Sequence, residues 1–206
     1  MTEFKNRCET IENLFNHIDK MSDGDASVKT VLILKSSFFV AMYNNVEATF
    51  YAVFERIHKD INTVDYDVLS TKLKKLFIDY HFNSVSKLTP DNFAKVHSAE
   101  YRFPLLDEFL NRKKIFSGNL DVKKAKEIYG NYGLSFYEFE QADADAMLII
   151  KNKRNSIAHG EDTLLDAGKG FTNKRLKEVM LSCQVILEKL IAIAEQYIQA
   201  KRYLRR

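Results

Sequence analysis

Turn-forming residues are scarce in this chain, which has only seven glycines and two prolines in 206 residues. A β-sandwich or β-barrel needs a turn roughly every ten residues, and this chain lacks the residues to build those turns. The nucleotide-binding α/β folds need a glycine-rich phosphate loop, and none is visible in the sequence. We therefore expect an all-α fold.

Composition and charge narrow the class of protein further. Hydrophobic residues make up 46% and charged residues 29% of the chain, which is typical of a folded globular protein. The net charge of +3 permits binding to nucleic acid but does not by itself favour it. Cys8 and Cys183 lie far apart in the sequence, which indicates reduced thiols rather than a disulfide framework.

The sequence also predicts where the protein acts. The first residues carry acidic side chains and no apolar run, so they do not resemble a signal peptide. The most apolar stretch, residues 31–41, is too short to span a bilayer. We predict a cytoplasmic protein without a membrane partner.

The spacing of apolar residues predicts long amphipathic helices. The second of them is apolar on almost every side near residues 31–54, so we expect it to be the most buried element. The long helices are predicted at residues 3–21, 27–61, 65–82, 138–159 and from 172 or 173 almost to 206. Short helices are predicted from Pro104 to about 114 and from Asp121 to about 129. Residues 83–103 are predicted as a loop with some short helix, and residues 161–170 as a polar loop. The sequence thus favours one helical bundle over residues 1–206, with a middle insertion of short helices and loops at about 62–135.

The end of the helix at 138–159 gathers polar side chains on one face. At 100° per residue, Lys151, Arg154, Asn155 and His159 fall within about 140° of arc. The opposite side carries Ala146, Ile149, Ile150, Lys153 and Ile157, and we expect that side to pack. Gly160 stands where a helix stop belongs.

These residue types suit the cleavage of RNA. A histidine can move a proton to or from a ribose 2′-hydroxyl near neutral pH. An arginine can bind two phosphate oxygens and stabilise the negative charge that builds up on the phosphate. An amide can orient the histidine, and no ligand cluster for a metal or cofactor is evident. Basic residues are also common at helix C-termini, so the spacing alone leaves catalysis open.

Several motifs resemble those of the HEPN superfamily. Arg154-Asn155-x-x-x-His159, ending a late helix of an all-α protein, is similar to the superfamily's signature. The order of further motifs resembles the bacterial MAE-type branch: Tyr43-Asn44-Asn45-Val46-Glu47, Phe116-Ser117-Gly118-Asn119-Leu120-Asp121, Tyr132-Gly133 and Arg154 to Gly160. The resemblance covers about residues 27–200.

The resemblance implies a HEPN-like helical bundle that dimerises, so that two Arg–His helices form one composite RNA-cutting cleft. It implies a metal-independent endoribonuclease of a toxin–antitoxin or antiviral system, with RNA, a second copy and a cognate antitoxin as partners. Arg154 and His159 would be the catalytic pair and Asn155 the supporting polar residue. Glu47 would face the same cleft, with Lys151 as a supporting cation. Some relatives carry a modifiable tyrosine where this chain has Glu161, so control of that kind is not expected here.

Two other functions stay open at this point. The chain could be a non-catalytic RNA-binding or protein-interaction module that keeps the HEPN fold, or a dimeric scaffold that uses its last helix as the seam. The remaining histidines have no metal-ligand spacing, and we expect them at the surface or partly buried: His17, His58, His81 and His97. Cys183 and the phenylalanines of the second helix are expected in the core: Phe38, Phe39, Phe50 and Phe54.

Overall fold

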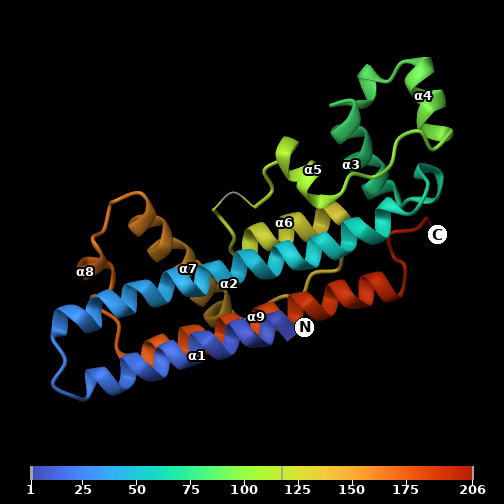
Figure 1. Cartoon of the computed structure of the whole chain (residues 1–206). Coiled ribbons are helices and arrows are strands. Elements are labelled where there is room, and N and C mark those ends of the chain that lie inside the picture. The colour runs from blue at the N-terminus through green and yellow to red at the C-terminus, as the bar shows by residue number, and fades with distance from the viewer. Residues whose placement is uncertain (1, 117, 206) are drawn as a thin grey trace. The chain divides into compact units, whose positions relative to one another are not determined.

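The computed structural model describes residues 2–116 and 118–205. The regular elements within these ranges are helices (Figure 1). Within these ranges the α-helices are α1 (Thr2–Ser22), α2 (Val28–Asn62), α3 (Thr71–His81), α4 (Pro90–His97), α5 (Leu106–Arg112), α6 (Val122–Tyr132), α7 (Gln141–Ala158), α8 (Leu164–Ala167) and α9 (Asn173–Gln199). Two 3₁₀ turns, Tyr66–Val68 and Val85–Lys87, complete the described elements. The prediction of an all-α fold is confirmed.

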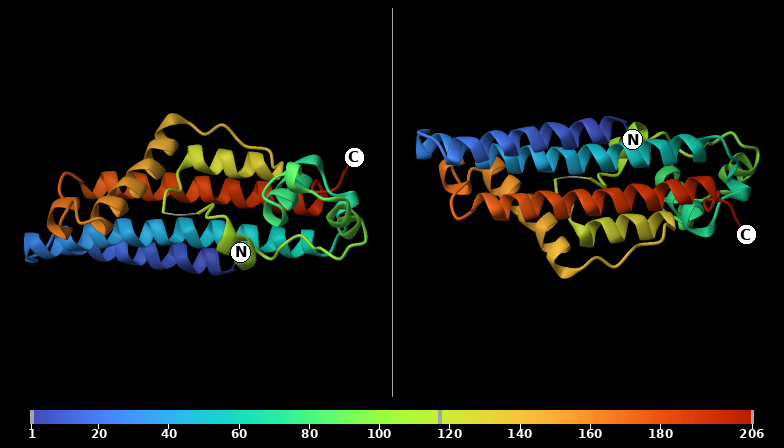
Figure 2. Two further views of the ribbon diagram at one scale, coloured as in Figure 1. Left: turned by 90° about the horizontal axis from the view of Figure 1, so that it is seen from above. Right: turned by 90° about the horizontal axis from the view of Figure 1, so that it is seen from below.

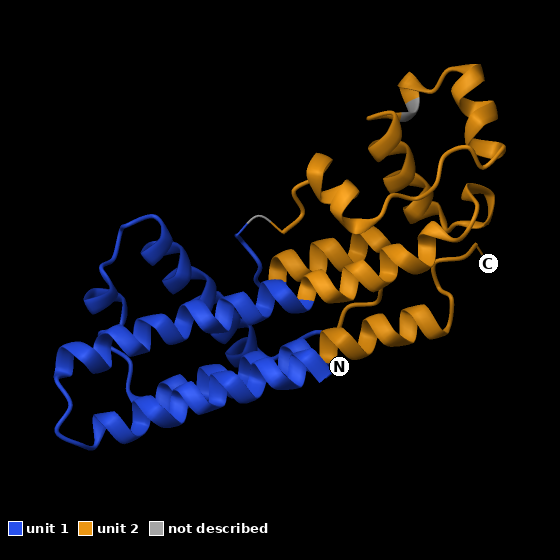
Figure 3. Cartoon of the chain, viewed as in Figure 1, with its two compact units in different colours: residues 1–49, 118–122, 138–188 blue, residues 50–117, 123–137, 189–206 orange. Residues whose placement is uncertain are grey.

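The chain divides into two compact units, which Figure 3 shows in different colours. The first unit comprises residues 1–49, 118–122 and 138–188, and the second comprises 50–117, 123–137 and 189–206. Both units are therefore built from separate stretches of the chain, and α2 and α9 each contribute to both. The single domain over residues 1–206, with an insertion at about 62–135, stays a prediction.

In the first unit, α1 packs against the first part of α2, and the two helices run side by side in both views of Figure 2. The predicted stripe of α1 forms this contact, since Phe15 is buried and its ring lies 6.2 Å from that of Phe38. Arg7 crosses the same interface, where its Nε donates a hydrogen bond to Asn45 Oδ1 at 2.8 Å. Phe38 and Phe39 are fully buried, so their prediction as core residues is confirmed.

The start of α9 and the segment before it close this unit. Cys183 is 1% exposed on the apolar stripe of α9, as the spacing predicts. At the start of the helix, Asn173 Nδ2 donates to Asp19 Oδ1 of α1 at 2.8 Å. Gly168, directly after α8, is required by packing, because a Cβ there would lie 2.1 Å from the carbonyl oxygen of Leu32.

An aromatic cluster fills the second unit. The Phe54 ring lies 5.7 Å from that of Tyr129 and 4.8 Å from that of Tyr132, and Phe50 and Phe54 are buried as predicted. His58 lies against this cluster and is fully buried, which corrects the prediction of a surface or partly buried histidine. Its Nδ1 lies 2.8 Å from the carbonyl oxygen of Pro104 and its Nε2 lies 2.8 Å from the Tyr132 hydroxyl. Both ring nitrogens thus have partners, which makes the burial of a polar ring tolerable.

The structure corrects two predicted long helices. The helix predicted at 65–82 is broken, because Leu69 pairs with Leu204 in an antiparallel bridge and Ser70 N donates to the carbonyl of Tyr203 at 2.8 Å. The last helix ends at Gln199 rather than near 206. Lys201 takes a left-handed φ of 46°, and Arg202 N donates to the carbonyl of Tyr197, which is the hydrogen-bond pattern of a Schellman stop.

Two smaller predictions also change. Pro104 lies two residues before α5 rather than inside its first turn. The loop predicted at 161–170 contains α8, because the Thr163 side chain accepts a hydrogen bond from the backbone of Asp166 and starts a short helix. Residues 117 and 206, which the predictions include, lie outside the described residues.

The buried His58 makes the stability of the protein depend on pH. Burial lowers the pKa of His58 to about 4, whereas an unfolded histidine titrates near 6.5. Below pH 6.5 the unfolded chain therefore binds a proton that the folded chain excludes, so stability falls with pH down to about 4. Between pH 7 and pH 5 we expect wild type to lose about 2 kcal/mol more of its free energy of unfolding than His58→Gln. Urea denaturation of both proteins at the two pH values measures this difference, and equal losses would show that His58 is protonated in the fold.

Candidate functional site

The chain turns sharply where α7 ends, and this turn sets the position of His159. His159 is the exposed cap residue of α7, and Gly160 takes a left-handed φ of 72°, as its placement in the sequence predicts. Gly160 N donates to the carbonyl of Ile157, and Glu161 N donates to that of Ser156 at 2.9 Å. This Schellman motif folds Glu161 and Asp162 back beside the last turn of the helix.

An open hollow of about 460 Å³ lies between the last turns of α7 and the residues after it. It is lined by Asn152, Lys153, Asn155, Ser156, His159, Glu161 and Asp162. The structure thus brings Asn155 and His159 to one surface, as their spacing of four residues predicts. The prediction that Lys153 packs away from them is wrong, because its long side chain reaches Asp162, with Nζ to Oδ2 at 3.4 Å.

Arg154 does not line this hollow but lies against α2. Its guanidinium carbon is 4.8 Å from the centre of the Tyr43 ring, and Nη2 is 4.0 Å from Oε2 of Glu47. Its Nη1 also donates a hydrogen bond to Oδ1 of Asn155 at 3.0 Å. Stacking, charge and an amide therefore fix the guanidinium from three sides, with the Arg154 side chain 28% exposed. Glu47 is in contact with this arginine, which is consistent with its expected place near the cleft.

Tyr43 anchors the segment that borders the arginine. It is fully buried, and its hydroxyl accepts a hydrogen bond from the backbone N–H of Leu120 at 3.0 Å. Burial, with a smaller contribution from the Glu47 carboxylate beside it, raises the pKa of Tyr43 to about 12. The phenol is therefore neutral at physiological pH and acts as a fixed hydrogen-bonding group.

The segment 118–121 carries two more groups of the site. Asn119 Oδ1 accepts a hydrogen bond from Asn155 Nδ2 at 3.2 Å, so the amide of Asn155 is oriented from both ends. Gly118 has a left-handed φ of 68°, and a Cβ there would lie 3.1 Å from Nη1 of Arg154. Gly118 thus allows the segment to pass close to the guanidinium. Ser117, in the same sequence motif, lies outside the described residues.

Lys151 forms the shortest ion pair of this region. Its Nζ lies 2.6 Å from Oδ2 of Asp121, and the two side chains are only 16% and 17% exposed. Lys151, which is expected as a supporting cation, lies against the segment before α6, where it pairs with Asp121. Its supporting role stays a prediction.

Sequence reasoning missed several residues of the site. Tyr43 and Asn119 appear in the sequence only as letters of two motifs. Their role depends on contacts across long stretches of chain, such as the sequence separation of 77 between Tyr43 and Leu120. Ser156 and Asp162 carried no signal at all, because their contacts follow from the turn after His159. The order of the motifs is the one sequence feature that points to these residues. It indicates that the segments belong together, but it does not show which side chains are in contact.

The described part of the chain contains neither a metal site nor a membrane span. Among residues 2–116 and 118–205, no three His, Cys, Asp or Glu side chains lie together in a way that could hold a metal ion. Within the same residues, no helix combines the length and apolar character needed to cross a bilayer.

A late helix that ends in Arg–Asn–x₃–His, with a glutamate of a long earlier helix on the arginine, gives this bundle the arrangement of a HEPN domain. Residues 1–203 match the family model described as MAE_28990-like HEPN. The chain therefore belongs to this HEPN family, and the resemblance stated from its motifs is confirmed. No curated protein and no solved structure matches the chain.

The Tyr43 hydroxyl offers a direct test of how the site is built. Tyr43→Phe keeps the ring under Arg154 but leaves the N–H of Leu120 without its acceptor, which should lower the free energy of unfolding by about 1–3 kcal/mol. Tyr66→Phe is the control, because no hydrogen bond to its hydroxyl occurs among the described residues, and it should change stability by less than about 0.5 kcal/mol. Chemical denaturation measures both, and equal effects would show that the hydroxyl does not hold the segment.

Proposed function

We propose that this HEPN protein is a metal-independent endoribonuclease that acts in the cytoplasm as a toxin or antiviral defence effector. The observation that carries the proposal is the pair of groups at the end of α7. Arg154 is held rigidly by Tyr43, Glu47 and Asn155, while His159 is exposed beside the open hollow. A fixed cation and an accessible imidazole are the two groups that metal-free cleavage of RNA requires.

In the proposed reaction, His159 takes the proton of a ribose 2′-hydroxyl. The 2′-oxygen then attacks the adjacent phosphorus, and the bond from phosphorus to the 5′-oxygen of the next nucleotide breaks. The leaving 5′-oxygen takes a proton from water, which gives a 2′,3′-cyclic phosphate and a 5′-hydroxyl. Arg154 stabilises the extra negative charge on the phosphate during this step. Asn155 orients the guanidinium through the hydrogen bond to its Oδ1.

The proposed active form is a homodimer. Within one chain, the guanidinium of Arg154 faces Tyr43 and Glu47, whereas His159 lines the hollow. A two-fold axis beside His159 would bring a second α7 to the site, so that one phosphate meets groups of both chains. A cognate antitoxin that covers this surface would keep the enzyme inactive.

A second function is favoured by one specific observation. Every basic residue of α7 is already paired with a carboxylate, in the pairs Lys151–Asp121, Lys153–Asp162 and Arg154–Glu47. A site whose cations are neutralised in this way would also suit a non-catalytic module that binds RNA weakly or binds another protein. The cleavage assay below separates the two functions.

Incubation of the pure protein with mixed RNA in EDTA tests the proposed reaction. We expect cleavage to continue in EDTA and the products to end in a 2′,3′-cyclic phosphate or a 3′-phosphate. An RNA with a 2′-deoxy nucleotide at the cut site should stay intact, because the attacking oxygen is missing. Activity that disappears in EDTA and returns with magnesium or manganese would contradict the metal-free mechanism.

Substitutions assign the activity to this site. His159→Ala and Arg154→Ala should each lower the cleavage rate by roughly a hundredfold or more, and His159→Ala should do so with little change in stability because His159 is exposed. His17→Ala and Arg175→Ala replace exposed residues of the same types and should leave the rate unchanged. Ile150→Ala, at a fully buried position of α7, should instead cost about 3 kcal/mol of stability. Cleavage at the wild-type rate by His159→Ala would show that the activity does not come from His159, and absence of cleavage by wild type would favour the non-catalytic module.

A further inference from the structure

Three ion pairs determine which cations of α7 are available to a phosphate. RNA can bind to these cations only where a phosphate oxygen takes the place of the resting carboxylate. The ease of this exchange depends on the distance and burial of each pair and on what else the carboxylate holds. The two lysine pairs differ in all three respects.

The pair between Lys151 and Asp121 is closed to exchange. Its atoms are 2.6 Å apart, and both side chains are less than one-fifth exposed. Removal of Lys151 would take a cation away from a largely buried carboxylate, which is costly. Lys151 therefore stabilises the fold and is not available to a phosphate.

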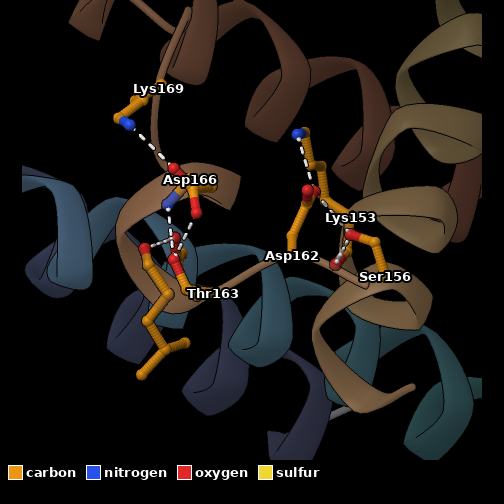
Figure 4. Close-up of polar contacts among 8 residues, drawn as sticks. Lys153, Ser156, Asp162, Thr163, Asp166 and Lys169 are labelled. Carbon is orange, nitrogen blue, oxygen red and sulfur yellow. Dashed lines mark hydrogen bonds and ion pairs between the residues drawn. The ribbon is translucent and has the colours of Figure 1, made fainter. Parts of the chain in front are cut away.

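The pair between Lys153 and Asp162 is open to exchange. Its atoms are 3.4 Å apart, and the side chains are 26% and 33% exposed. The same Oδ2 of Asp162 also accepts a hydrogen bond from Ser156 Oγ at 2.9 Å, and Asp162 N donates to the carbonyl of Ser156 at 3.2 Å (Figure 4). Asp162 therefore keeps two contacts with α7 when Lys153 leaves it, and the turn after His159 is preserved.

Lys153 also lies where a phosphate beside the cut would pass. It lines the hollow together with Asn155 and His159. Its Nζ is 5.8 Å from the centre of the Phe171 ring, so part of its surroundings is apolar and strengthens its attraction for an anion. Lys151 and Arg154 are not among the residues that line the hollow.

We propose that Lys153 binds an RNA backbone phosphate next to the cleaved bond, and that Asp162 is the counterion it leaves on binding. This inference rests on the proposed function, and it adds a substrate-binding residue that the spacing of the sequence assigned to the packing face. Glu161, which lines the same hollow, disfavours an anion there, so binding depends on the exchange at Lys153 rather than on a general positive charge.

The test measures RNA binding without cleavage. The probe is a short 2′-O-methyl RNA, whose blocked 2′-oxygen prevents the reaction, and its affinity is measured over a series of salt concentrations. Lys153→Gln should bind about fivefold more weakly than wild type and lower the slope of log affinity against log salt by about 0.7, the loss of one phosphate contact on a single strand. Asp162→Asn should bind more tightly than wild type, because the resting counterion is gone.

The chain offers a matched control at the end of α8. Lys169 and Asp166 form another Lys–Asp pair, 2.7 Å apart, in which a threonine hydroxyl also contacts the carboxylate (Figure 4). Neither residue lines the hollow. Lys169→Gln removes the same charge from the same unit and should leave both the affinity and the salt slope close to those of wild type.

Each outcome decides between the claims. If wild type binds the probe and Lys153→Gln behaves like Lys169→Gln, the assignment of Lys153 is wrong and the proposed ribonuclease stands. If wild type does not bind the probe at any salt concentration, both the assignment and the proposed function are overturned. Unchanged or weaker binding by Asp162→Asn would contradict its role as the resting counterion.

Discussion

The buried side chain of Tyr43 joins three stretches of chain that are far apart in the sequence. Its backbone belongs to α2, its hydroxyl accepts a hydrogen bond from Leu120, and its ring lies under the guanidinium of Arg154 on α7. A buried phenol with a raised pKa stays neutral, so it can hold a backbone N–H and a cation without charge of its own. Asn155 and Asn119 then meet because their segments are already fixed. The geometry of the candidate site therefore depends on one side chain that has no part in the proposed chemistry.

Charge pairing fits a site that is stable at rest and reactive in the proposed function. In the chain without RNA, Glu47 and Asp162 neutralise Arg154 and Lys153, so the folded state carries no strong local excess of positive charge. In the proposed complex, a phosphate would replace these carboxylates and recover the same attraction in a partly desolvated setting. Tyr43 and Asn155 would keep Arg154 oriented during the exchange, which is the preorganisation that electrostatic catalysis needs.

The sequence predicted the class of fold and the end of α7 well, because both depend on local patterns. Helical periodicity and the stop at Gly160 are set within a few residues, and the order of the motifs identified the family. Three features could not be predicted in this way. The break at Leu69 depends on pairing with a residue near the C-terminus, and the burial of His58 depends on partners supplied by α6 and the segment before α5. The position of Lys153 follows from a turn that brings Asp162 back to the helix, against the expectation from helical spacing.

Mixing two inactive variants tests the central claim, a composite site at a two-fold axis, most directly. Arg154→Ala and His159→Ala proteins are combined in equal amounts under conditions that allow subunit exchange, which differently tagged chains confirm. If a site takes arginine from one chain and histidine from the other, each mixed dimer keeps one of its two sites intact. Since about half of the dimers are mixed, about a quarter of wild-type cleavage activity should return. No return of activity in proven mixed dimers, or full wild-type activity in a monomer at low concentration, would contradict the composite site.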